Sequence, residues 1–153
     1  MKPEITVETD TWPNGQKQRE TPYVNGEKHG LETWWYENGQ KRYEIPYVNG
    51  QEHGIETWWY SNGQKWHETP YFNGQINEFA IWWHINGQKQ CEIPYVNNQR
   101  HGLETGWFSD GSLSWIRKWH QDQIVWEINF PFQKQILENA KVELFFHETP
   151  ELI

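Results

Sequence analysis

The chain has 153 residues and a formal net charge of −8, and only 35% of its residues are hydrophobic. This length suits one domain, and the acidic balance argues against nucleic acid or an anionic membrane as a partner. The 12 Trp, 7 Tyr and 7 Phe argue against disorder, because each aromatic ring can bury roughly 150–250 Å².

The amino terminus, residues 1–10, alternates polar and apolar residues. It lacks the apolar core of a signal peptide, and no stretch of the chain approaches the length of a membrane span. The sequence therefore predicts a cytoplasmic protein. The single cysteine, Cys91, rules out an internal disulfide, and we interpret it as a small strand residue in a reducing compartment.

A repeat with a step of 24 residues follows this segment. Four copies of the sequence Asn-Gly-Gln-Lys occupy residues 14–17, 38–41, 62–65 and 86–89. A second Asn-Gly series keeps the same step at 25–26, 49–50 and 73–74, with Asn-Asn at 97–98. A fixed period of this length indicates a repeat architecture, which usually works as an extended surface.

Each unit therefore contains two turns that separate two runs of strand length. Asn-Gly between runs rich in Thr, Trp, Tyr, Val and Ile is a strong hairpin signal; residues 30–36 and 41–48 are one such pair of runs. Because the connections are short, neighbouring strands must be antiparallel. The sequence predicts an all-β fold of tandem β-hairpins, about five units forming an elongated single-layer meander of about ten strands.

The register of each hairpin depends on its turn. If the Asn38-Gly39 loop has two residues, Trp34 faces Tyr43 and Trp35 faces Arg42. Adjacent strand residues point to opposite faces, so each Trp-Trp pair must place one ring on each side of the sheet. Proline recurs inside the second strand of each unit, as at Pro46, and we expect a bulge or an early break there.

The fourth unit departs from the others. The sequence Gly-Leu/Ile-Glu-Thr is replaced at residues 78–81 by Glu-Phe-Ala-Ile, beside Trp82 and Trp83. This change predicts an apolar patch on both faces. Either the patch binds a partner, since aromatic anchors dominate interface energies, or it contacts the carboxy-terminal segment or reflects drift.

The fifth unit and the carboxy terminus lose the pattern. We interpret residues 1–126 as the repeat array and residues 127–153 as an α/β cap that covers an open sheet edge. Within the cap, residues 133–140 have the spacing of two helical turns, and residues 141–147 alternate as a last strand does.

Recurrent histidines and glutamates invite a catalytic or metal-binding interpretation. Equivalent histidines such as His29 and His53 lie two strands apart, about 9–10 Å, which is too far to share one zinc ion. The recurrent glutamates, such as Glu32 and Glu44, read as solvated or cross-strand charge rows. The sequence has no phosphate loop, nucleophile elbow or HExxH motif, so we expect no enzymatic activity, no metal and no cofactor.

The spacing of the recurrent residues resembles that of a known repeat family over roughly residues 5–126. The pattern Gly-x4-Trp-Tyr-x-Asn-Gly-Gln-x3-Glu-x2-Tyr-x-Asn-Gly is met from Gly30 to Gly50 and again from Gly54 to Gly74. This pattern resembles a bacterial variant of the MORN repeat that is common in the YwqK family of toxin–antitoxin antitoxins. The resemblance implies a small soluble protein that neutralises a toxin by binding it.

We therefore expect a non-catalytic protein that docks a protein partner, such as a basic toxin, on an aromatic sheet face. The residues expected to contact the partner are Trp34, Trp58, Trp82, Tyr36, Tyr60, Phe79 and Ile81. A self-associating scaffold, such as a homodimer, is an alternative because a single-layer sheet exposes apolar patches. Glycan binding by regularly spaced rings is another, although the missing secretion signal argues against it.

Overall fold

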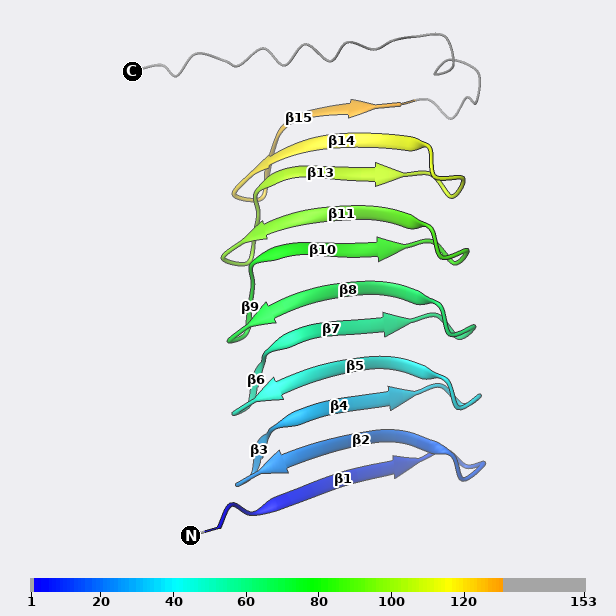
Figure 1. Ribbon diagram of the computed structural model, residues 1–153, viewed down its shortest axis with the longest axis vertical. Coiled ribbons are helices and arrows are strands. Elements are labelled where there is room, and N and C mark those ends of the chain that lie inside the picture. Colours follow the sequence, from blue (N-terminus) through cyan, green and yellow to red (C-terminus); the bar gives the residue numbers. More distant parts are fainter. Residues whose placement is uncertain (1, 131–153) are drawn as a thin grey trace.

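The computed structural model describes residues 2–130, and all of its strands lie in one open, antiparallel sheet of 15 strands (Figure 1). The long strands follow one another in chain order: β1 (Ile5–Thr11), β2 (Lys17–Val24), β4 (Gly30–Trp35), β5 (Lys41–Val48), β7 (Gly54–Trp59), β8 (Lys65–Phe72), β10 (Glu78–Trp83), β11 (Lys89–Val96), β13 (Gly102–Trp107), β14 (Leu113–His120) and β15 (Gln123–Asn129). Four two-residue strands extend the hairpins at one end: β3 (Glu27–Lys28), β6 (Gln51–Glu52), β9 (Gln75–Ile76) and β12 (Gln99–Arg100).

The predicted all-β meander is confirmed. The part of the chain that the structure describes contains no helix, and hence none long and apolar enough to cross a membrane. The last strand of the described residues, β15, runs from Gln123 to Asn129 and so extends past residue 126, where we expected the array to end. The helix and strand expected within residues 133–147 lie outside the described residues.

The two Asn-Gly series form different turns. In the second series both residues have positive φ, 51° at Asn25 and 80° at Gly26, as a two-residue type I′ turn requires. In the first series only the glycine does, and Tyr36 and Gln40 close a three-residue loop through the bond from Tyr36 N to Gln40 O (2.8 Å). This is a type I turn followed by a glycine bulge, so the two-residue loop on which the expected register was conditional is not formed.

The longer loop changes only part of the expected register. Trp34 pairs with Tyr43 as predicted, but Trp35 pairs with Lys41 instead of Arg42. The longer loop shifts the pairing by one residue, and a bulge at Arg42 shifts it back before Tyr43. The two irregularities cancel, so the residues beyond them keep the faces that a two-residue loop would give.

The recurrent proline does not break its strand. Pro46 lies within β5 and pairs in register with Leu31 of β4. Its carbonyl oxygen accepts a hydrogen bond from His53 N (2.9 Å) on the other side, toward β7. Because the N–H and C=O of one strand residue point to the same side, the missing N–H costs the β4–β5 ladder nothing.

The irregularity lies instead in the neighbouring strand, where a glycine faces the proline ring. Gly54 has a φ of 119°, and a Cβ atom placed on it would lie 2.9 Å from Pro46 Cγ. A side chain at this position would therefore be crowded as well as conformationally strained. This contact explains why a glycine begins three of the equivalent strands, at Gly30, Gly54 and Gly102.

A single-layer sheet has no interior, so its side chains are buried only by their neighbours in the sheet. We call the side that carries Trp34, Tyr43 and Trp58 the tryptophan face, and the side that carries Pro46 and Leu31 the proline face. Among the described residues few apolar side chains are buried, namely Ala80, Pro94 and Trp119, while several threonines and glutamates are buried. Cross-strand contacts within each face therefore hold the fold together.

Candidate partner-binding surfaces

A column of stacked rings runs along the tryptophan face across five strands. The ring centroids are 5.5 Å apart for Trp34 and Tyr43, 4.4 Å for Tyr43 and Trp58, 5.7 Å for Trp58 and His67, and 5.5 Å for His67 and Trp82. The angles between neighbouring ring planes are only 19–32°. The rings therefore turn their faces toward one another, and each contact contributes to the stability of the sheet.

Buried carboxylates fix the orientation of these indoles. Glu32, only 5% exposed, accepts hydrogen bonds from Trp34 Nε1 (3.3 Å), Thr21 Oγ1 (3.1 Å) and Lys28 Nζ (2.7 Å). Burial raises the pKa of Glu32, but these hydrogen bonds together lower it below its usual range. We expected the glutamate row that includes Glu32 to be either solvated or a cross-strand charge row; the burial of Glu32, Glu56 and Glu104 excludes the first alternative, and the bond from Thr21 of β2 to Glu32 agrees with the second.

The other two members of this row have the same role. Glu56 accepts a hydrogen bond from Trp58 Nε1 (2.5 Å), and Glu104 accepts bonds from Trp115 Nε1 (3.0 Å) and Trp119 Nε1 (2.5 Å). A carboxylate beside each indole satisfies two polar groups that burial would otherwise leave without partners. At residues 32–34 and 56–58 the Glu-x-Trp sequence therefore supports packing, whereas Glu104 binds indoles of β14 because Gly106 occupies the tryptophan slot.

The predicted contact residues Trp34, Trp58 and Trp82 all lie half-buried in this ring column. Tyr36 and Tyr60 lie beyond the strand ends and donate hydrogen bonds to the next unit, from Tyr36 Oη to Trp59 O (2.8 Å) and from Tyr60 Oη to Trp83 O (2.9 Å). The geometry gives all of these residues a part in joining units. Their contact with a partner stays a prediction.

The fourth unit interrupts the carboxylate row. Ala80 occupies the slot of Glu32 and Glu56 and is 1% exposed, so Trp82 lacks the acceptor that its counterparts have. The neighbouring His67 has a Nδ1 atom without a hydrogen-bond partner, and burial lowers its pKa although the charge of Glu56 opposes the shift.

Burial raises the pKa of the Cys91 thiol to about 12, so Cys91 is protonated and packs as a small strand residue.

The turn motif also joins consecutive units. Asn38 Oδ1 accepts a hydrogen bond from Gln40 N (3.1 Å), and Asn38 Nδ2 donates to Ser61 O of the next unit (2.9 Å). His53, which we expected to be a polar residue flanking a turn, has its Nδ1 atom 3.2 Å from Asn73 Oδ1. Residues 2–130 contain no group of three side chains placed to hold a metal ion.

The proline face carries a surface that the sequence analysis did not identify. Prolines alternate along it with large apolar side chains that are 42–57% exposed, in one column across the sheet: Val7, Leu31, Ile55, Phe79 and Leu103. A second exposed set borders the type I′ turns: Val48, Phe72 and Val96. The signal was the apolar residue that recurs at one position of each unit, directly after the glycine at Leu31, Ile55 and Leu103, and the register places Leu31 and Ile55 opposite a proline.

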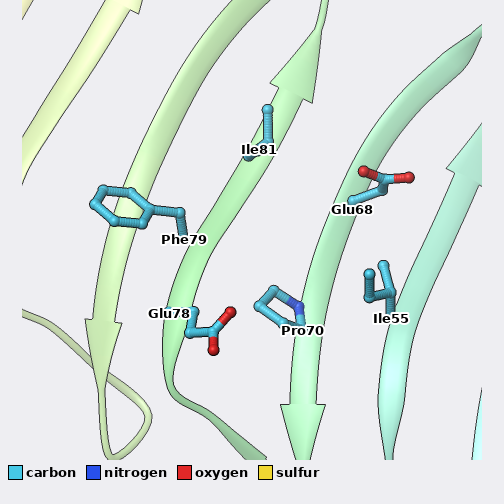
Figure 2. Close-up of a pocket in the computed structure, with 6 residues that line it drawn as sticks. All are labelled: Ile55, Glu68, Pro70, Glu78, Phe79 and Ile81. Atoms are coloured by element: carbon cyan, nitrogen blue, oxygen red, sulfur yellow. The ribbon is translucent and has the colours of Figure 1, made fainter.

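The proline face is hollowed at the fourth unit. A pocket of about 240 Å³ lies between β7, β8 and β10. Figure 2 shows the residues that line it: Ile55, Glu68, Pro70, Glu78, Phe79 and Ile81. Phe79 and Ile81 alternate with Ala80 and Trp82 along β10, so they lie on the face opposite the ring column. The structure thus separates the predicted contact residues into two groups on two faces.

Comparison with protein families gives a partial match. Residues 28–49 and 52–77 match the MORN repeat variant at two adjacent positions. No curated protein gave a match to the chain. The match supports the predicted repeat type and a repeat-type role in protein binding or as a scaffold, and it does not address antitoxin function.

Proposed function

We propose that this chain is a non-enzymatic protein of the cytoplasm that docks a protein partner on its proline face. The exposed apolar column carries this proposal. Single exposed apolar residues are ordinary on protein surfaces, whereas a contiguous run of them marks an interaction surface. Here Leu31, Ile55 and Phe79 lie in one column across three consecutive units, and they are 44%, 57% and 50% exposed.

We further propose that the partner is a basic toxin that this chain neutralises by binding. The resemblance to the antitoxin family motivates this identity, and the net charge of −8 supports a basic partner. An acidic protein attracts a basic one at long range, and salt screens that attraction. The association rate constant should therefore fall as salt is added. An association rate constant that does not change with salt concentration would contradict the electrostatic part of the proposal.

The neighbouring gene offers a direct test of the toxin hypothesis. Its product should arrest bacterial growth when expressed alone, and co-expression of this chain should restore growth. The double variant Ile55→Glu, Phe72→Glu should fail to restore growth, because it places charge in the exposed apolar surface at residues that are 57% and 62% exposed. Ile85→Glu is the matched control, because Ile85 is 62% exposed but lies in a type I turn outside that surface.

Self-association is the second candidate, because the same column would be covered by another copy of the chain. Light scattering of the purified protein separates the two: a dimer that the double variant dissociates would favour a scaffold. Glycan binding is less compatible with the geometry. Sugars stack on open ring faces, whereas the rings from Trp34 to Trp82 stack on one another.

A further inference from the structure

Two residues of the fourth unit have a different chemistry from their counterparts, and both line the pocket in Figure 2. Glu78 occupies the slot of Gly30, Gly54 and Gly102, each the first residue of its strand. Ile81 occupies the slot of Thr33, Thr57 and Thr105, since each of these pairs with a glutamate of the adjacent strand. The unit has gained one carboxylate and one apolar side chain at a single place.

Glu78 is held in a strained conformation at this place. Its φ is 143°, within the region that favours glycine, and the equivalent glycines lie at 106–119°. A Cβ atom on those glycines would lie 2.9–3.0 Å from the proline of the adjacent strand. Positive φ directs the Glu78 side chain to the proline face, beside Pro70 (Figure 2). Strain at one residue of a regular repeat suggests that the residue serves something other than stability.

The charges around the pocket leave one negative charge uncompensated. Glu68 and Glu92, which flank Ile81 on the two adjacent strands, are paired with Lys65 and Lys89. Glu78 forms no ion pair with any residue in the described part of the chain. Three carboxylates against two ammonium groups give a local charge of −1, at the mouth of a pocket with walls of Ile55, Pro70, Phe79 and Ile81.

We propose that this pocket receives a lysine or arginine side chain from the protein partner. This inference rests on the proposed function and adds to it the anchor residue and its site. The aliphatic stem of a basic side chain matches the apolar walls, and its cationic head matches the unpaired carboxylate of Glu78. The exposed ring of Phe79 offers a further contact for the cation.

NMR titration of the full chain with N-acetyl-arginine amide and N-acetyl-lysine amide tests the site. Chemical-shift changes should concentrate on residues 78–81 and on the other pocket residues Ile55, Glu68 and Pro70, and should be absent from the equivalent residues 30–33 and 102–105. N-acetyl-norleucine amide, which has an apolar stem and no charge, should bind more weakly. Equal changes in all units, or equal binding of the norleucine probe, would overturn the proposal.

Glu78→Gln removes the charge and keeps the side-chain shape, so it should raise the Kd for the basic probes about two- to fivefold. Glu27→Gln is the matched control, because Glu27 is exposed but lies in β3, away from the pocket, and should leave the Kd unchanged. Unchanged binding by Glu78→Gln would refute the anchor site. It would leave the proposed function standing if the Ile55→Glu, Phe72→Glu variant still loses its partner.

Discussion

His67 shows how the ring column makes stability depend on pH. Its imidazole stacks between Trp58 and Trp82, and burial lowers its pKa in the folded state. Above the unfolded-state pKa of about 6.5, histidine is neutral in both states and contributes no pH dependence. Below that pH the unfolded chain takes up the proton more readily, so the free energy of unfolding falls until the folded form is protonated as well.

The variant His67→Tyr, which copies Tyr43 of the equivalent slot, should remove this fall. Urea unfolding between pH 8 and pH 5.5 measures it as a difference between variant and parent that grows toward low pH. The control His53→Asn copies Asn77 and keeps His67, so it should retain the parent's profile. A parent whose stability is flat over this range would contradict the stated role of His67.

Glu78 provides a second test at the scale of one residue. Glu78→Gly should increase the free energy of unfolding by about 1 kcal/mol, because it relieves a positive φ and the contact with Pro70. The reciprocal variant Gly54→Ala should decrease it, since the added Cβ atom would lie 2.9 Å from Pro46 Cγ. Denaturant titration measures both, and a destabilised Glu78→Gly would show that Glu78 supports the fold.

At the scale of a strand or turn, links between units should dominate stability. Tyr60→Phe removes the hydrogen bond to Trp83 O and should lower the free energy of unfolding by about 0.5–1.5 kcal/mol. Tyr23→Phe removes a hydrogen bond to the exposed Glu8, and its effect should be smaller. Thermal unfolding of the two variants measures the loss of stability in each. Equal losses would show that the hydrogen bond of Tyr60 between units contributes no more than the exposed bond of Tyr23.

The elements that could be predicted are those set by local chemistry. Asn-Gly pairs between aromatic runs identified the hairpins up to residue 89, whereas the later turns carry other residues, such as Asp110-Gly111 and Gln121-Asp122. Adjacent residues such as Trp34 and Trp35 had to lie on opposite faces. The loop length could not be read from Asn38-Gly39, because both turn types accept this dipeptide. The pairing of Trp34 with Tyr43 was predicted correctly because the bulge at Arg42 offsets the longer loop.

The candidate site was less accessible to sequence reasoning for a different reason. The replacement of Gly-Leu/Ile-Glu-Thr by residues 78–81 was visible, as was the apolar character of Phe79 and Ile81. The pocket depends on the positive φ of Glu78, which turns a carboxylate toward the proline face. The sequence does not report that a glutamate at this slot keeps the positive φ of the equivalent glycines, so this part required the structure.

At the scale of the whole molecule, stability should be a sum over units and the contacts between them. Deletion of residues 30–53 joins His29 to Gly54 and removes one complete period. The shortened chain should fold with the same circular dichroism per residue and a urea m-value lower by about a fifth. A 12-residue deletion is the control. It removes one strand, so every later strand would have to run in the opposite direction and could not keep its present pairing. Loss of cooperative unfolding in the 24-residue deletion would refute the additive description.

The bonds that join the units span short stretches of chain, 23 residues from Asn38 to Ser61 and 20 from His53 to Asn73. Closing such loops costs little entropy, and low contact order favours rapid folding. As the ribosome releases the nascent polypeptide, each new hairpin can settle onto the one before it without waiting for the end of translation.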